Sequence, residues 1–313
     1  MPDRMLTWAV RGLWALLPFT VWPAVGAALR HEPSAVGTTA VVGAWVVWGV
    51  VLVAALVRTP LGLTALRCAA PAVLAAAVAA VVTGDPSPLA MAAAVAWSAL
   101  LTAVVFLPAT AIVWVNGPAY PNERRFPLVA PGPLLLGPIE MAWALLVGLP
   151  VSAALLLAGG RWVLGGVLAG VATPVATVAA RALHGLSRRW LVFVPAGVVV
   201  HDRTTLADPV LFQRQVIASL TPALAGALRR RTSVAPTGTP SAPSAGDSVA
   251  PDSLDLTEGA PGLALELRLV EEVALARAGA RGSAHEQAAW GVLVTPGRPG
   301  EALAYAAAHH LPV

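Results

Sequence analysis

Lysine is absent from this chain: all 20 basic residues are arginines. A Walker A phosphate loop needs its lysine and Schiff-base catalysis needs an amine, so both kinds of site are excluded. Cys68 is the only cysteine, which excludes an intramolecular disulfide, a CxxC redox pair and a cysteine zinc cluster. These absences remove several classes of cofactor and metal site.

Charge is also scarce. Only 12% of the residues are charged and 57% are hydrophobic, whereas soluble domains carry about 25% charged residues. The apolar residues are concentrated in the first 180 positions, which indicates a membrane domain. A pI near 10.5 would suggest nucleic acid as the partner of a soluble protein. Because most arginines flank apolar runs, we interpret them instead as topology signals and anionic headgroup contacts, and we expect no nucleic-acid partner.

Long runs without charge predict about six transmembrane helices. Each run is long enough to cross about 30 Å of hydrocarbon as a helix. Proline interrupts five of the six runs, which membrane helices tolerate when neighbours satisfy the freed carbonyl. In the last run, Gly166 and Gly170 form a GxxxG pair that allows close helix approach. We place the spans near residues 12–29, 36–57, 67–83, 89–114, 138–158 and 162–180.

Arginine asymmetry predicts the orientation. With the N-terminus inside, the cytoplasmic segments contain nine arginines and the external loops contain two, Arg30 and Arg161. Losing the short, alanine-rich third span would invert everything after it and place Arg124 and Arg125 outside. The arginine-only, alanine- and proline-rich composition suggests a GC-rich bacterial genome. We therefore expect a multi-pass protein of the bacterial cytoplasmic (inner) membrane with both termini in the cytoplasm.

The periodicity changes from helical to alternating after Arg189. Residues 190–194 and 198–202 read as a β-hairpin around a glycine-containing turn, with further strands near 210–220, 263–270 and 291–294 and a helix over 299–310. Residues 232–262 are rich in proline, serine and glycine and predict a disordered insertion. The sequence thus predicts an all-α membrane bundle over 1–189, followed by a small, mainly-β (α+β) cytoplasmic domain over 190–313.

Three stretches of this domain, Arg188–Asp202, Leu206–Arg214 and Gly291–His310, resemble the pleckstrin-homology-like domains found in bacterial membrane proteins. The whole chain is similar to uncharacterised multi-pass proteins of high-GC Gram-positive bacteria that carry such a domain. The resemblance implies a seven-stranded fold closed by a helix, where the sequence shows five or six strands. It also implies scaffolding or lipid-proximal interaction, and it carries over no catalytic residues.

The connection over residues 116–138 is the most unusual segment, because it is rich in proline and glycine and holds both asparagines of the chain. Asn122, Arg124 and Arg125 there are candidates for a phosphate or lipid-headgroup contact, since arginine presents paired donors. The alternative is a rigid connection whose arginines only set topology. Basic residues below the sixth span are further candidates for contact with anionic lipid: Arg181, Arg188 and Arg189.

Glu140 is the only carboxylate expected to enter the membrane, which makes it a candidate functional acid. A local explanation competes with that role. With Gly137 as cap and Pro138 at the first helical position, Glu140 falls in the first helical turn, where the helix dipole favours negative charge.

No sequence motif specifies a reaction, so we expect neither an enzyme nor a bound cofactor or metal. The function we favour is interaction or scaffolding at the cytoplasmic membrane face, with anionic lipid or an envelope protein as partner. The alternative is a transporter or transporter accessory subunit, suggested by the proline-broken spans and Glu140. A third reading, an envelope-lipid enzyme using Asn122, Arg124 and Arg125, lacks an identifiable acid, base or metal.

Overall fold

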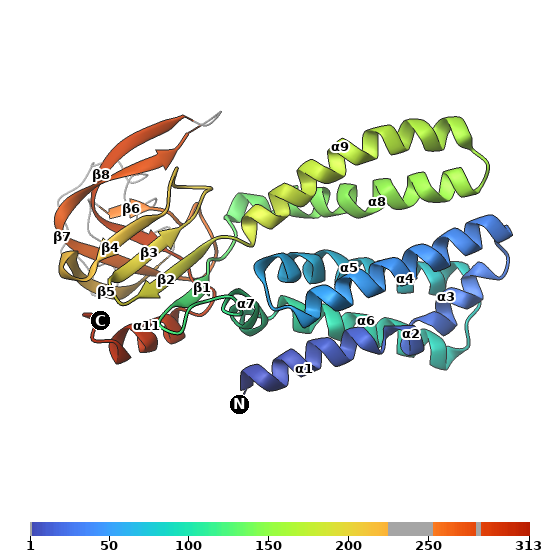
Figure 1. The fold of residues 1–313 in the computed structure, drawn as a ribbon, viewed down its shortest axis with the longest axis horizontal. Helices are drawn as coiled ribbons and strands as arrows, with labels where there is room; N and C mark the ends of the chain where they lie inside the picture. Colours follow the sequence, from blue (N-terminus) through green and yellow to red (C-terminus); the bar gives the residue numbers. More distant parts are fainter. Residues whose placement is uncertain (1, 225–252, 280–282) are drawn as a thin grey trace, which may run out of the picture. The chain divides into compact units, whose positions relative to one another are not determined.

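The structure is a computed structural model that describes residues 2–224, 253–279 and 283–313. It divides into two compact units (Figure 1), one helical and one rich in β-strands. The helical unit comprises Met1–Pro118 and Ile139–Ser187, and the second unit comprises Ala119–Pro138 and Arg188–Val313. The chain therefore passes between the two units at several positions, of which the domain boundary expected near residue 189 is one. The connection over residues 119–138 also belongs to the β-rich unit.

Five helices of the first unit are long and apolar enough to cross a membrane, which supports a multi-pass membrane protein. Each overlaps one of the second to sixth expected spans, although α6 covers only the first part of the fourth. The third expected span, the shortest of the six, lies within a helix of 24 residues. The five helices are α4 (Ser34–Leu56), α5 (Pro60–Thr83), α6 (Pro88–Phe106), α8 (Pro138–Ala158) and α9 (Trp162–Leu186).

Capping residues explain where two of these helices begin. The Thr59 hydroxyl accepts a hydrogen bond from the Gly62 amide at the start of α5, at 3.1 Å. The Ser87 hydroxyl accepts a hydrogen bond from the Ala90 amide at the start of α6, at 3.4 Å. A proline follows each cap at the first helical position, where its fixed φ is favourable and its missing N–H costs nothing.

The first expected span is broken into three short helices, with Pro18 and Pro23 at the starts of the second and third. Its beginning lies beside the end of α4, where the Arg11 guanidinium donates to the Ala55 and Leu56 carbonyls. Its end lies beside Gly84, which follows α5. The segment therefore runs alongside the long helices in the bundle (Figure 1), as α1 (Pro2–Ala15), α2 (Leu17–Thr20) and α3 (Trp22–Leu29).

Pro108 also breaks the fourth expected span. Helix α6 ends at Phe106, and a separate helix, α7 (Pro108–Val115), follows. The Thr110 hydroxyl donates to the Val104 carbonyl at 2.6 Å, so a side chain replaces the backbone hydrogen bond that proline cannot make.

The GxxxG pair does not pack as expected. Nothing in the described part of the chain lies within 4 Å of a Cβ built on Gly166 or Gly170. The close approach falls one residue earlier, because a Cβ on Gly165 would meet the Leu157 side chain at 2.8 Å. Gly165 is thus the glycine that lets α8 and α9 pack near their connection.

The described residues of the second unit form two four-stranded sheets. The order in the first sheet is β1-β2-β3-β4, and its strands are β1 (Arg124–Pro127), β2 (Trp190–Val194), β3 (Gly197–His201) and β4 (Val210–Gln213). The order in the second sheet is β5-β7-β8-β6, and its strands are β5 (Ile217–Leu224), β6 (Ser253–Asp255), β7 (Leu263–Ala278) and β8 (Ala284–Val294). Short 3-10 helices η1 (Gly132–Leu135) and η2 (Arg214–Val216) and helix α11 (Pro299–Ala308) complete the unit.

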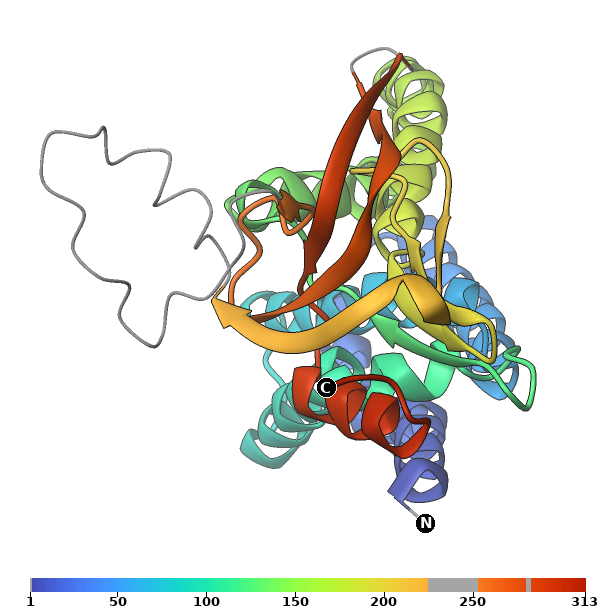
Figure 2. The ribbon, with the colours of Figure 1, turned by 90° about the vertical axis from the view of Figure 1, so that its left-hand side faces the viewer.

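The predicted hairpin is confirmed as β2 and β3, and the predicted terminal helix as α11. The single strand expected near 210–220 was wrong, because η2 separates β4 and β5, which lie in different sheets. Strands β7 and β8 are longer than expected and form the long twisted hairpin in orange and red in Figure 2.

The expected disordered insertion, 232–262, lies outside the described residues as far as residue 252. Its last part is ordered: β6 pairs in parallel with β8 over Gly291–Leu293. The Asp255 carboxylate accepts hydrogen bonds from the amide and hydroxyl of Thr257, a local turn that ends β6.

Strand β1 is another element that sequence periodicity missed. It pairs with β2 in antiparallel register, from Arg124 opposite Phe193 to Pro127 opposite Trp190. Phe126 on β1 is 1% exposed and packs edge-to-face on Phe193, with ring centroids 5.6 Å apart. The connection between α7 and α8 is therefore an edge strand of the first sheet.

We predict that Phe126→Ala loosens the first sheet. Truncating a buried phenylalanine costs roughly 3–5 kcal/mol, so amide hydrogen exchange of β2 in the full-length protein in nanodiscs should accelerate about 100-fold or more. Leu211→Ala is the control, because Leu211 lies on β4 of the same sheet and is 45% exposed. Unchanged protection of β2 in the Phe126 variant would show that β1 does not support the sheet.

Candidate functional site

Arg124 and Arg125 do not act as a pair. They are neighbours on a strand, and successive side chains of a strand point to opposite faces. Arg125 shares its face with Trp190, whereas Arg124 shares its face with Phe126. Because their side chains lie on opposite faces of the strand, the two arginines are separate candidates for a phosphate or headgroup contact.

Arg125 is held by its surroundings. Its guanidinium donates two hydrogen bonds to the Glu123 carboxylate, at 2.7 and 3.2 Å, and lies 5.4 Å from the Trp190 ring centroid. The hydrogen bond from Arg125 lowers the pKa of Glu123, with support from the Tyr120 amide, while partial burial opposes the shift. Glu123 is thus a carboxylate that its own neighbour neutralises.

Arg124 lies on the other face, 5.9 Å from the Phe126 ring centroid. Among the residues that the structure describes, no carboxylate forms an ion pair with it. The five N–H donors of an arginine lie around the edge of its planar guanidinium group. When the guanidinium lies over an aromatic ring, this edge remains available to a ligand. Arg124 is therefore the cation of this segment that is open to a ligand.

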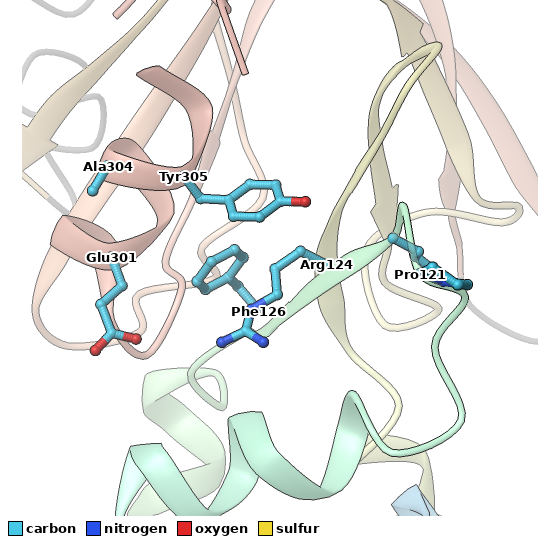
Figure 3. Close-up of a pocket in the computed structure, with 7 residues that line it drawn as sticks. Pro121, Arg124, Phe126, Glu301, Ala304 and Tyr305 are labelled. Carbon is cyan, nitrogen blue, oxygen red and sulfur yellow. The ribbon is translucent and has the colours of Figure 1, made fainter. Parts of the chain in front are cut away.

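An open pocket of about 540 Å³ lies between β1 and α11, with Arg124 in one wall (Figure 3). Phe126 and Tyr305 form an aromatic surface, with ring centroids 6.1 Å apart. Glu301 lines the opposite wall and forms an ion pair with Arg298. The pocket is lined by Pro121, Glu123, Arg124, Phe126, Glu301, Ala304 and Tyr305.

The end of α11 is anchored, which places Tyr305. The Arg214 guanidinium donates to the His309 carbonyl at 2.8 Å and so satisfies a free carbonyl at the end of the helix. The His309 ring stacks on Tyr305 with centroids 4.0 Å apart. Tyr305 is thereby held between His309 and the two phenylalanines of the first sheet, and its orientation in the pocket is defined.

Arg189 has a structural role and no access to headgroups. Its side chain is 2% exposed and donates two hydrogen bonds of 2.7 Å to the Asp202 carboxylate. A third hydrogen bond reaches the Val129 carbonyl at 2.9 Å. The residue expected to touch lipid therefore links β2, the end of β3 and the segment after β1 inside the fold.

The other expected contacts are on surfaces. Asn122, Arg181 and Arg188 are exposed, as a headgroup contact requires. Glu140 is exposed in the first turn of α8, the position in which the helix dipole stabilises a carboxylate. The pocket includes none of these four side chains.

Sequence reasoning identified Arg124 but missed Phe126, Glu301 and Tyr305. The two-residue spacing of Arg124 and Phe126 is compatible with a strand, but the prolines on both sides, Pro121 and Pro127, obscured this signal. The amphipathic helix over 299–310 was predicted, yet nothing in the sequence pointed to its partner. Because β1 and α11 lie far apart in the sequence, no local pattern could indicate that their residues form one pocket.

Within the described residues, no group of three or more histidine, cysteine, aspartate or glutamate side chains is placed to hold a metal ion. No family model, curated protein or solved structure matches this chain.

We predict that Asp202→Asn destabilises the β-rich unit, because it leaves the Arg189 charge buried without its partner. Breaking such a pair costs about 3–5 kcal/mol. The variant should show faster cleavage within residues 190–201 by chymotrypsin at neutral pH in the full-length protein. Asp208→Asn, at an exposed aspartate of the same unit, should behave as the wild type.

The same pair sets an acid dependence. Burial acts to raise the pKa of Asp202, but the hydrogen bonds and charge of Arg189 outweigh it and the pKa lies below its usual value. The stabilisation is therefore present above the unfolded pKa of about 3.9 and is lost as the pH falls through the folded pKa. The difference in the stability of the β-rich unit between the wild type and Asp202→Asn should shrink below that pH. A difference in stability that stays constant with pH would contradict the role of the pair.

Proposed function

We propose that this chain is a multi-pass protein of the bacterial cytoplasmic membrane whose β-rich unit binds a partner protein at the cytoplasmic face. The observation that supports this is the open pocket between β1 and α11, which combines an available arginine with an aromatic surface. Arginine and tyrosine are enriched at the positions that dominate binding energy in protein interfaces.

Binding without chemical turnover is the proposed activity. Two of the charged groups in the pocket are already engaged: Glu123 with Arg125, and Glu301 with Arg298. Groups neutralised in this way orient a ligand more readily than they transfer a proton, because an acid–base catalyst needs a free group with a matched pKa. The proposed role is therefore scaffolding or recruitment.

A pleckstrin-homology-like relationship is part of the proposal. Two sheets and a C-terminal helix that packs on β5 and β7 support it. Three features depart from that pattern: the described residues form eight strands, β6 runs parallel to β8, and β1 comes from the connection between two membrane helices.

We also propose six spans, with α1 to α3 as the first. The support is that this segment extends from the end of α4, at Arg11, to the end of α5, at Gly84. Trp14, about one helical turn after Arg11, and Trp48 bind each other, since each indole N–H donates to the other residue's carbonyl at 3.0 and 3.1 Å. Because the segment α1 to α3 extends along the full length of the helices beside it, we expect it to cross the membrane as they do.

The topology is tested by single cysteines in a Cys68→Ser background. An impermeant maleimide added to intact cells should label Arg161→Cys, whereas Asp3→Cys and Arg203→Cys should react only after permeabilisation. Labelling of Asp3→Cys from outside would mean that α1 to α3 do not cross. Labelling of Arg203→Cys from outside would reverse the proposed orientation.

Partner binding is tested by photo-crosslinking in cells. A photoreactive amino acid in place of Ala304 or Pro121, on opposite walls of the pocket, should give an adduct of the same mass. The same amino acid in place of Leu211, an exposed residue of β4, should not give that adduct. Absence of a shared adduct from the two pocket positions, or an identical adduct from Leu211, would refute recruitment through this pocket.

A further inference from the structure

We propose that the pocket between β1 and α11 recognises a peptide carboxylate that lies next to an apolar side chain of the same partner. This inference rests on the proposed function and names the chemistry of the partner.

The charge of the pocket favours one anionic group. Three arginines, Arg124, Arg125 and Arg298, line the pocket or pair with its residues, against two carboxylates, Glu123 and Glu301. Three positive and two negative charges leave a net charge of +1. Because Arg125 and Arg298 are each engaged by a glutamate, the excess charge is located on Arg124.

The position of Arg124 strengthens its interaction with a carboxylate. The guanidinium lies over Phe126, which is almost fully buried, so one face of the cation is shielded from water. Arginine and carboxylate match in geometry through two parallel hydrogen bonds, and such charge-assisted bonds are about twice as strong as neutral ones. The carboxylate is expected at the open edge of the guanidinium.

The rest of the pocket offers an apolar contact beside that carboxylate. Tyr305 presents an aromatic ring held in place by Phe126, Phe193 and His309. Ala304 adds a methyl group on the exposed side of α11, as Figure 3 shows. An aliphatic or aromatic side chain next to the carboxylate would cover this surface, and a rigid tyrosine loses little conformational entropy on contact.

The small net charge of the pocket favours a peptide over a lipid surface. A membrane with anionic headgroups presents many negative charges together, whereas the two glutamates of the pocket engage Arg125 and Arg298 and leave Arg124 as the excess cation. A peptide brings a single carboxylate to Arg124, so the charges on the two sides match. Specificity would thus arise from this match in charge and from the apolar contact beside it.

The test uses the full-length protein in nanodiscs of neutral phosphatidylcholine. The probes are an acetylated and amidated Phe-Glu-Leu peptide and the matched Phe-Gln-Leu peptide, titrated by saturation-transfer difference NMR. The glutamate peptide should bind, and the glutamine peptide should bind about 10-fold more weakly or not at all, as expected for loss of a charged hydrogen-bond pair.

Arg124→Gln should weaken binding of the glutamate peptide by about 10-fold or more, whereas Arg203→Gln should leave it unchanged. Arg203 is the matched control, because it is an exposed arginine of the same unit and its substitution removes the same charge. Equal affinity for the two peptides, or no effect of Arg124→Gln, would overturn the proposal.

A second arm separates the sources of negative charge. Glycerol 3-phosphate, a soluble lipid-headgroup mimic, should bind no better to the wild type than to Arg124→Gln. Arg124-dependent binding of glycerol 3-phosphate without binding of the glutamate peptide would assign the pocket to a headgroup and overturn the inference. A shared crosslink from Ala304 and Pro121 without peptide binding would leave recruitment in place and reject the carboxylate chemistry alone.

Discussion

The antiparallel pairing of β1 with β2 is the constraint on which the rest of the β-rich unit depends. The two strands are neighbours in the sheet, yet two apolar helices, α8 and α9, separate them in the sequence. Without β1, the β2 edge would lose its hydrogen-bond partners and Phe126 would leave the aromatic cluster. A sheet edge exposed in that way invites non-native pairing.

Two buried interactions secure this arrangement in different ways. The Phe126, Phe193 and Tyr305 rings join the first sheet to α11 through apolar contact. Arg189 adds a directional constraint, because its two hydrogen bonds to Asp202 and its third to the Val129 carbonyl leave little freedom to the segment after β1. Removing either partner of the pair would leave a charge buried, so the pair specifies the arrangement more strongly than it stabilises it.

Strand geometry also distributes chemical roles between adjacent arginines. Arg125 packs on Trp190 and neutralises Glu123, whereas Arg124 faces the pocket. Residues of the same type and nearly the same place in the chain therefore differ in their contacts. The difference comes from the two-residue period of the strand, and amino-acid composition contains no information about it.

The apolar helices α4, α5, α6, α8 and α9, each long enough to cross a membrane, followed from the sequence alone, because length and hydropathy are properties of contiguous residues. The same holds for the β2–β3 hairpin and for α11, whose signals are local. Tertiary structure alone decided that residues 124–127 form a strand, that Arg189 is buried, and that α11 meets β1 in a pocket. Each of these depends on contacts between segments far apart in the chain, and local periodicity contains no information about such partners.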